Sequence, residues 1–538
     1  MYKKLILFLI SLIFMSCTPQ KEVAKMDVVS SQLDKYIVQT TYGKVRGYQH
    51  DKSYIFKGIP YAKAERFMPP VEPDSWKGVR STLAFGPISP QHIGLARDEY
   101  EFLFQHKVGY MSEDCMRLNV WTPGINDGKK RPVMVWFHGG GFSGGYGHVL
   151  PAFDGENINK KGDVLLVTVN HRLNVLGFLN LSDFGNKYKY SGNVGAMDLI
   201  AALKWINQNI EAFGGDPENI TIFGQSGGGG KVTSIMVAPS AQGLFHKAII
   251  QSGTRPYFLE GNQSKMIGQR IMKELGLQPS DVDELQKIPY KTLIDVGDKV
   301  IDNLNEELSN ADTPLYNSRL GWGPYVDGDF IAYQPISEEA LALSRDISII
   351  MGTNKNESIP FRANVDISMP PTMEEVKGLL KEKFGDRTDE YIEIVKKTYP
   401  DNISPMDFLN IETDYRSRTI MFAKHRAKVN PIYMYFFQWN SPALDGKYQS
   451  PHGLELPFVF SNVDRMPELV GGGKDALVLN NMIGQAWINF AKSGDPNHEG
   501  LPTWPVYSEE NSSLMVFDNE CKVRSHHDKE LLDYMTKY

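Results

Sequence analysis

Six short runs of consecutive apolar residues occur along the chain, and each is typical of a buried strand. They cover residues 133–137, 164–169, 220–223, 248–250, 347–351 and 432–437. Strands that are apolar throughout are buried on both faces, as in a mostly parallel sheet covered by helices. Between the second and third runs, residues 194–213 carry apolar side chains at helical spacing, which predicts an amphipathic helix ending at Gly214-Gly215. The pattern therefore predicts an α/β fold.

The segments around these runs predict further elements. Residues 36–61 alternate and turn at glycine, which indicates antiparallel strands at a sheet edge. Residues 62–112 lack periodicity and predict a long irregular loop. Residues 259–345 and 361–428 are charged and mostly helical in pattern, so we expect two large helical insertions that form a cap. The chain then ends with a predicted helix, a short strand and a last helix, at residues 477–491, 514–517 and from 527.

The third apolar run leads directly into a serine-containing turn. Residues 224–228 read GQSGG and fit the G-x-S-x-G nucleophile elbow, in which a serine sits on a tight strand-to-helix turn. The flanking positions must be nearly free of side chains, and the following helix presents its N-terminus to a developing anion. Glycine-rich turns with serine are common, but here a strand precedes the motif and an apolar segment follows it. Ser226 is the predicted nucleophile.

Longer stretches around this motif resemble one family, the type-B carboxylesterases, which also contain the cholinesterases and the bacterial para-nitrobenzyl esterases. Residues 213–228 are similar to the serine signature of this family, and residues 113–119, EDCMRLN, are similar to its second signature. Further similar stretches lie at residues 192–210, 248–254, 352–358, 452–460 and 487–497. The resemblance covers roughly residues 36–520. It implies an α/β-hydrolase fold, with a central mostly parallel sheet, flanking helices and a helical cap.

The resemblance also implies a catalytic triad. A serine needs a base to accept its proton and a carboxylate to orient that base, and α/β-hydrolases carry them in the order serine, acid, histidine. Glu357 follows the fifth apolar run and His452 the sixth, inside matching motifs. Ser226, Glu357 and His452 are therefore the expected triad. The alternatives considered are His138 and His171 for the base, although both precede the nucleophile, and Asp327 for the acid.

Glycines after the first apolar run are the expected oxyanion hole. Backbone without side chains can approach a tetrahedral intermediate closely, and by resemblance the donors are the amides of Gly140, Gly141 and Gly227. Gln225 and Ser252, which matches a buried family serine, are expected to support the triad. The resemblance requires no metal and no organic cofactor.

Departures from the family pattern narrow the substrate. Position 225 is glutamine where most members have glutamate, the carboxylate that helps cholinesterases hold a cationic substrate. Residues 77–115 contain no tryptophan, whereas cholinesterases keep a choline-stacking tryptophan in that loop. A quaternary ammonium therefore has little to bind, and we do not expect cholinesterase activity. Cys115 also lacks an upstream partner in the mature chain, so we predict that it is unpaired.

The N-terminus has the features of an export signal. Lysines at positions 3 and 4 precede the apolar run 5–15, which is too short to span a membrane, and Ser16-Cys17 follows as a lipobox-like cleavage point. Cys17 is the expected lipidation site, although a plain signal peptide remains an alternative. The expected organisation is a signal over residues 1–17, a tether over 18–33 and a single domain over 34–538.

Composition sets the remaining limits. The net charge of −7 is scattered, and no lysine- or arginine-rich run suits nucleic acid. The sequence therefore predicts an exported, periplasmic or cell-surface serine hydrolase that cleaves small carboxylic esters and reaches the membrane through its lipid anchor. An amidase or a lipase on the same triad, or a non-catalytic adhesion protein of this fold, stays open as an alternative. The oligomeric state is not predicted.

Overall fold

The computed structural model describes residues 29–30, 32, 34–92, 98–309, 319–359, 371–400, 404–411 and 413–536. The expected export signal with Cys17 lies outside the described residues, as does most of the expected tether. No helix in the described part of the chain combines the length and the apolar character that a membrane crossing requires.

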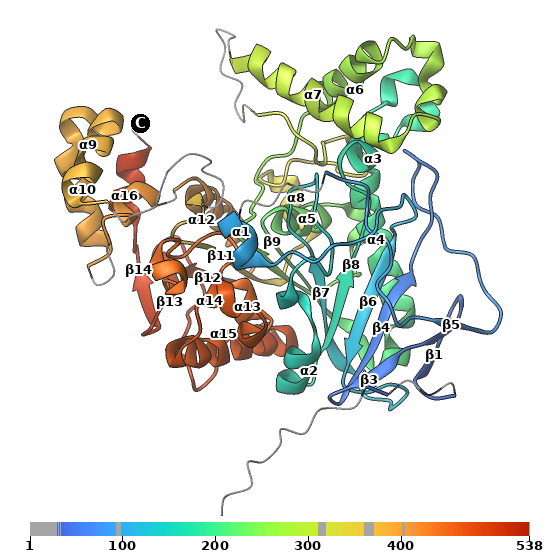
Figure 1. The fold of residues 1–538 in the computed structure, drawn as a ribbon, viewed down its shortest axis with the longest axis horizontal. Helices are drawn as coiled ribbons and strands as arrows, with labels where there is room; N and C mark the ends of the chain where they lie inside the picture. Colours follow the sequence, from blue (N-terminus) through green and yellow to red (C-terminus); the bar gives the residue numbers. More distant parts are fainter. Residues whose placement is uncertain are drawn as a thin grey trace, which may run out of the picture.

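An eleven-stranded sheet with the order β14-β13-β12-β11-β10-β9-β7-β8-β6-β4-β3 forms the centre of the molecule (Figure 1). Seven neighbouring strands are parallel, and antiparallel strands extend the sheet at both edges. The parallel strands are β7 (Arg131–Phe137), β8 (Leu165–Val169), β9 (Gly215–Gln225), β10 (Lys247–Gln251), β11 (Ser348–Asn354), β12 (Ile432–Phe437) and β13 (Ser513–Phe517). The edge strands are β3 (Tyr48–His50), β4 (Ser53–Pro60), β6 (Arg117–Thr122) and β14 (Lys522–Ser525).

The six apolar runs are all strands of this sheet, which confirms the predicted α/β class. Strand β6 was not predicted, because its sequence RLNVWT mixes polar and apolar residues. The predicted edge strands over residues 36–61 divide between two sheets. β3 and β4 join the large sheet, whereas β1 (Ile37–Thr40) and β2 (Gly43–Arg46) form a small sheet with β5 (Val79–Ser81), which lies in the region expected to be an irregular loop.

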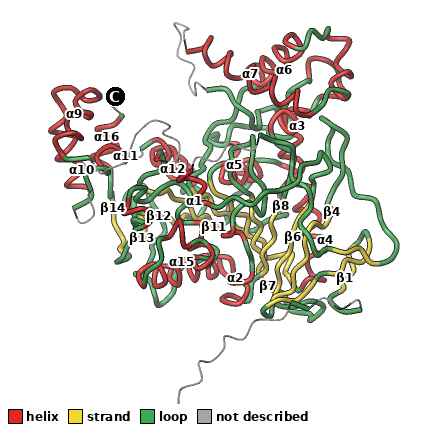
Figure 2. Tube along the Cα trace, in the orientation of Figure 1, coloured by secondary structure: helices red, strands yellow, loops and turns green. Residues whose placement is uncertain are grey.

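Both faces of the sheet are buried by helices (Figure 2). Val133, Val135 and Phe137 of β7 pack in one core with α4 (Val194–Asn209) and α5 (Gly227–Met236). The alternate residues Met134 and Trp136 pack in a second core. On that face lie α2 (Glu156–Gly162), α13 (Leu456–Val459) and α15 (Lys474–Ser493). Burial of both faces explains why the strand sequences are apolar without alternation.

The two insertions are helical as expected, and a part of each projects from the molecule in Figure 1. The first holds α6 (Gly261–Glu274), α7 (Tyr290–Ser309) and α8 (Glu338–Leu343). The second holds α9 (Met373–Phe384), α10 (Thr388–Thr398), α11 (Asp407–Asn410) and α12 (Asp414–Arg426). Helix α7 packs on α3 (Asn174–Phe178), which follows the carboxyl end of β8, and α12 packs on β11 and β12. Shorter helices are α1 (Asp98–Phe104), α14 (Pro467–Val470) and the C-terminal α16 (Lys529–Met535).

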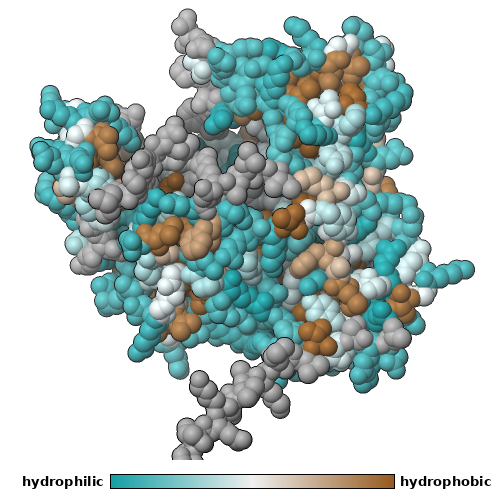
Figure 3. All heavy atoms as spheres, viewed as in Figure 1, coloured by the Kyte–Doolittle hydropathy of each residue, from teal (hydrophilic) through white to brown (hydrophobic). Residues whose placement is uncertain are grey.

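Two further observations concern the surface and the cysteines. The face of the molecule in Figure 3 is mostly hydrophilic with small separate hydrophobic patches, an ordinary distribution for a folded domain.

Cys115 and Cys521 are both buried free thiols, which confirms the prediction that Cys115 is unpaired. Burial raises the pKa of the Cys115 thiol to about 12, so this thiol is protonated and unreactive at neutral pH.

Candidate active site

The predicted triad residues follow three strands that lie close together in the sheet. Ser226 comes directly after β9, Glu357 follows β11 and His452 follows β12. Strand β10 separates β9 from β11, and β12 is the next neighbour. Because the carboxyl ends of parallel strands meet at one edge of a sheet, residues separated by more than two hundred positions converge there.

The turn at Ser226 is strained and sterically enforced. Ser226 has φ 57° and ψ −125°, a conformation that L-residues rarely adopt. A Cβ at Gly228 would lie 2.0 Å from the carbonyl oxygen of Phe137, and a Cβ at Gly227 would lie 2.2 Å from that of Gly141. Only glycine fits at these two positions, as the nucleophile elbow requires.

His452 and Glu357 form a buried pair. His452 Nδ1 lies 2.5 Å from Glu357 Oε2, and the other carboxylate oxygen of Glu357 accepts a hydrogen bond of 2.7 Å from the backbone N–H of Asn354. Glu357 is inaccessible to solvent and His452 is 8% exposed. A carboxylate on Nδ1 places the ring proton there and leaves Nε2 unprotonated, which is the tautomer that can accept a proton from a serine.

Gln225 contacts the other nitrogen of the same ring. Its Nε2 lies 3.0 Å from His452 Nε2, and the Gln225 side chain is buried. Since Nε2 of this tautomer is an acceptor, the amide of Gln225 donates the hydrogen bond. Among the described residues, no hydrogen bond joins Ser226 Oγ to His452. In this structure the amide of Gln225 therefore donates to the ring nitrogen of His452 that does not contact Glu357.

A second buried carboxylate, Glu455, lies behind the pair. Its two oxygens accept hydrogen bonds from Asn354 Nδ2 at 2.7 Å and from Gln251 Nε2 at 3.3 Å. Burial, and next the neighbouring charge of Glu357, raise the pKa of Glu455 to about 7, against a lowering contribution from His452. Sequence reasoning missed this residue. Its signal was an acidic side chain within the otherwise apolar segment LELPFVF, three positions after His452.

The expected oxyanion loop is pressed against the nucleophile turn. Gly140 and Gly141 have φ of 87° and 61°, and the loop follows β7. Within the described ranges, the backbone N–H groups of these two glycines donate no hydrogen bond to protein. Gly227 is the first residue of α5, so its N–H precedes the first bond within that helix. Three N–H groups are thus available for an anion beside Ser226.

Ser252 and the rejected alternatives lie elsewhere around the site. Ser252 is buried after β10, and its hydroxyl contacts no hydrogen-bond partner among the described residues.

The alternative bases His138 and His171 stack with ring centroids 5.2 Å apart, and burial lowers the pKa of both. His138 Nδ1 lies 2.8 Å from the Gly139 carbonyl oxygen. Asp327 accepts a 2.9 Å hydrogen bond from Asn193 Nδ2 and holds a loop. None of these three alternatives joins the His452–Glu357 pair.

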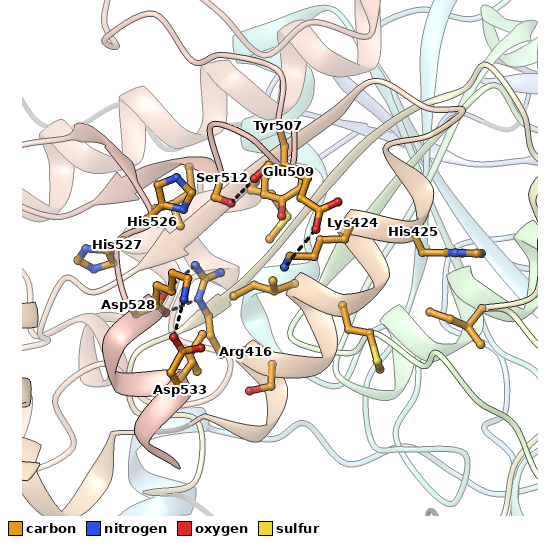
Figure 4. A pocket seen from close by; sticks show the side chains of 18 of the residues that line it. Arg416, Lys424, His425, Tyr507, Glu509, Ser512, His526, His527, Asp528 and Asp533 are labelled. Carbon is orange, nitrogen blue, oxygen red and sulfur yellow. Dashed lines mark hydrogen bonds and ion pairs between the residues drawn. The ribbon is translucent and has the colours of Figure 1, made fainter. Parts of the chain in front are cut away.

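A cavity of about 840 Å³ lies apart from these residues (Figure 4). It is lined by residues of α12, β12, β13 and α16 and of the turns beside them, and Arg416, Tyr507 and Asp528 form part of its wall. Arg416 pairs with Asp528 at 2.6 Å, which ties α12 to the C-terminal helix. Neither Ser226, Glu357 nor His452 lines this cavity, so it has no part in the candidate active site.

Comparisons with known proteins agree with this geometry. The model of the Carboxylesterase family matches residues 34–535. The chain therefore belongs to the carboxylesterase family, and its sheet and flanking helices form the α/β-hydrolase fold.

The proteins and structures similar to this chain include several esterases and other hydrolases. The chain is 32% identical over 501 residues to the para-nitrobenzyl esterase of Bacillus subtilis, covering 92% of this chain and 97% of the relative. It is 33% identical over 504 residues to the phenmedipham hydrolase of Pseudarthrobacter oxydans, covering 90% and 95%. A Clostridium hathewayi esterase that can hydrolyse aliphatic aromatic polyesters superimposes with a TM-score of 0.84 at 35% identity, over 95% of this chain and 99% of that chain. The protein is a carboxylesterase.

Replacement of Glu455 by glutamine should change how stability depends on pH. The folded pKa of Glu455, about 7, lies above the usual 4.5, so folding favours the protonated acid. The stability that this group contributes is full below pH 4.5 and is lost as pH rises through 7. Glutamine does not titrate, so the variant should gain about 3 kcal/mol relative to wild type between about pH 4.5 and pH 8.

Urea unfolding of wild type and Glu455→Gln at both pH values measures this difference. Any constant cost of the altered hydrogen bonds cancels between the two pH values. Glu510 is exposed, and Glu510→Gln serves as the matched control, with a difference from wild type that stays the same at both pH values. A Glu455→Gln difference that is equally independent of pH would show that Glu455 is not held protonated by the fold.

Gln225→Glu should move the acid limb of the kcat/KM profile. His452 already faces Glu357 at 2.5 Å, with Glu455 and the ring of Tyr415 close by. Another carboxylate at 3.0 Å would stabilise the imidazolium, and protonated His452 cannot act as a base. The acid limb should shift to higher pH by about one to three pH units. Gln225→Ala removes the hydrogen bond without adding charge and should leave the limb near its original pH. If the acid limb of the kcat/KM profile stays at the same pH in Gln225→Glu, the contact between residue 225 and His452 would be contradicted.

Proposed function

We propose that Ser226, His452 and Glu357 form the catalytic triad of a serine carboxylesterase that works through an acyl-enzyme. The observation that carries the proposal is the buried His452–Glu357 pair, 2.5 Å apart, at the sheet edge where the strained Ser226 turn also lies. A histidine held in this tautomer by a carboxylate is the base that a serine hydroxyl requires.

The proposed reaction has two halves. Ser226 Oγ attacks the ester carbonyl carbon while His452 Nε2 accepts the serine proton, and the tetrahedral intermediate collapses as His452 returns this proton to the departing alcohol. Water, deprotonated by His452, then attacks the acyl-enzyme, and the second tetrahedral intermediate collapses as His452 returns this proton to Ser226 Oγ and the carboxylic acid leaves. Glu357 stabilises the imidazolium in both halves. The first step requires Ser226 to take the place of Gln225 at Nε2.

The oxyanion hole is proposed at Gly140, Gly141 and Gly227. Three backbone N–H groups, which have no acceptor among the residues that the structure describes, would bind the negative oxygen of each tetrahedral intermediate. Loss of one such donor typically costs about 10²- to 10³-fold in kcat. Ser252 and Gln225 are proposed to support the triad from beside it.

Substrate preference follows from the uncharged side chain at position 225. Gln225 gives a cationic alcohol no carboxylate to approach, so choline esters are not the proposed substrates. The relatives are named for para-nitrobenzyl esters and phenmedipham, and a solved neighbour acts on aliphatic aromatic polyesters. We therefore propose small esters with an aryl or alkyl group, ahead of amides and long-chain lipids. The intact set of nucleophile, base, acid and N–H donors argues against a purely adhesive role.

Ser226→Ala should abolish ester hydrolysis while leaving the fold intact. Removal of a triad nucleophile costs about 10⁶-fold in kcat. Initial rates with 4-nitrophenyl butyrate and labelling with a fluorophosphonate probe measure the effect, and circular dichroism checks the fold. The exposed Ser280 is the matched control, and Ser280→Ala should keep full activity and labelling. Turnover or labelling retained in Ser226→Ala would refute the assignment, and an unlabelled wild-type chain would favour an adhesive role.

We also propose that the protein is exported and anchored by a lipid on Cys17, on the periplasmic or outer surface, with residues 34–538 as its single domain. The support is the pattern of basic residues, a short apolar run and Ser16-Cys17. In a bacterial host, metabolic labelling with an alkyne-tagged palmitate should mark the wild-type chain and not Cys17→Ser. Equal labelling of both would contradict lipidation at this residue.

A further inference from the structure

Two arginines beside the triad have no acidic partner within the described part of the chain. Arg255 lies four residues after the end of β10, and Arg418 lies on α12. Both side chains are exposed, and among the described residues neither forms an ion pair or a hydrogen bond. Other arginines of this chain do: Arg172 pairs with Asp198 at 2.6 Å and Arg416 with Asp528 at 2.6 Å.

A buried hydrogen bond holds the two arginines near each other. Thr254 Oγ1 and Thr419 Oγ1 lie 3.0 Å apart, and each threonine is the sequence neighbour of one arginine. Both threonines are buried, at 7% and 0% exposure, so this contact fixes α12 against the segment after β10. Burial among neighbouring atoms, and next the positive charge of Arg418, lower the pKa of Arg255. The two guanidinium groups are therefore close enough for their positive charges to repel each other.

Contacts on both sides link this pair to the catalytic groups. The guanidinium carbon of Arg255 is 5.6 Å from the centre of the Phe142 ring, and Phe142 follows the oxyanion glycine Gly141. The Arg255 side chain also lies against α5, because a Cβ at Gly230 would be 3.0 Å from Arg255 Cγ. On the other side, the ring of Tyr415 lies 5.5 Å from the His452 ring, three residues before Arg418 on α12.

An unbalanced pair of cations is costly unless something anionic completes it. Arginine stays protonated even when burial lowers its pKa, so Arg255 and Arg418 repel each other in the free enzyme. The Arg255 side chain is crowded by protein yet still reaches solvent, so a ligand can reach it. The planar fork of a guanidinium fits a carboxylate through two parallel hydrogen bonds.

We propose that Arg255 and Arg418 bind a carboxylate carried by the substrate, so that the enzyme prefers esters that also bear a free carboxylate group, such as half-esters of dicarboxylic acids. This inference rests on the proposed function of Ser226. It names the substrate class of the same site, with the ester at Ser226 and the free carboxylate at the two arginines.

Two matched pairs of esters test the proposal. In the first pair, the carboxylate is on the acyl side: mono-4-nitrophenyl adipate is compared with its methyl-capped form. In the second pair, it is on the alcohol side: 4-carboxyphenyl butyrate is compared with 4-carbamoylphenyl butyrate. The readout is the ratio of kcat/KM for the charged ester to that for the neutral ester, in which any effect on the shared acylation chemistry cancels.

In the wild-type enzyme, the ratio should exceed one by about ten- to a hundredfold in at least one pair, as expected for charge-assisted hydrogen bonds. Arg255→Met and Arg418→Met should each lower this ratio by about tenfold, and high salt should lower it in wild type. Arg255→Lys keeps the positive charge but lacks the planar guanidinium, so its ratio should lie between those of wild type and Arg255→Met. The pair of esters that shows the preference identifies the half of the substrate that carries the carboxylate.

Arg345 provides the matched control. It is also exposed, and it lies just before the amino end of β11, at the sheet edge opposite the triad. Arg345→Met should leave the ratio unchanged. Ratios at or below one in both pairs, or a preference that survives both Arg255→Met and Arg418→Met, would overturn the proposal while leaving the triad assignment standing. Failure of Ser226 to turn over even the neutral esters would instead overturn the proposed function together with this inference.

Discussion

The close packing of the backbone after β9 against the end of β7 is the constraint on which the reactive geometry depends. Side chains at Gly227 or Gly228 would collide with the carbonyl oxygens of Gly141 and Phe137 at 2.2 and 2.0 Å. This packing keeps Ser226 in its strained conformation and presses the oxyanion loop against it. Strained residues persist only where their surroundings over-determine them. Here the surroundings are a parallel sheet whose two faces are both sealed by helices.

Charge is distributed unevenly around Ser226. Glu357 lies on the His452 side, where its carboxylate favours a protonated imidazole ring, and Glu455, whose pKa burial raises to about 7, lies behind this pair. Gln225 adds a hydrogen bond there without adding a negative charge. The other side carries the arginines Arg255 and Arg418. In the proposed reaction, an ester with a negative group directed toward the arginines is attracted without disturbing the base, whereas a cationic ester meets repulsion. The same arrangement thus serves both the proposed chemistry and the proposed selection.

Much of the fold was predictable because a strand that is buried on both faces is apolar along its whole sequence. Strands buried on both faces need apolar residues at every position, so six of them were evident as runs. Strand β6 has no continuous apolar run, because it contains Asn119, which donates a buried hydrogen bond to Thr168 on β8. The triad was predictable from motifs and chain order, although its roles remain a proposal. Glu455 was missed because its burial depends on Asn354 and Gln251, which reach it from β11 and β10.

The sequence by itself determined the fold class, the carboxylesterase resemblance, the serine turn and the identities of its expected partners. Each of these depends on a pattern within a contiguous stretch of residues. The tertiary structure alone decided which side chains meet. It set the amide of Gln225 on His452, raised the pKa of Glu455 by burial beside Glu357, and brought Arg255 and Arg418 together through Thr254 and Thr419. These contacts join residues 98 or more positions apart, so their distances and electrostatics exist only after the sheet has formed.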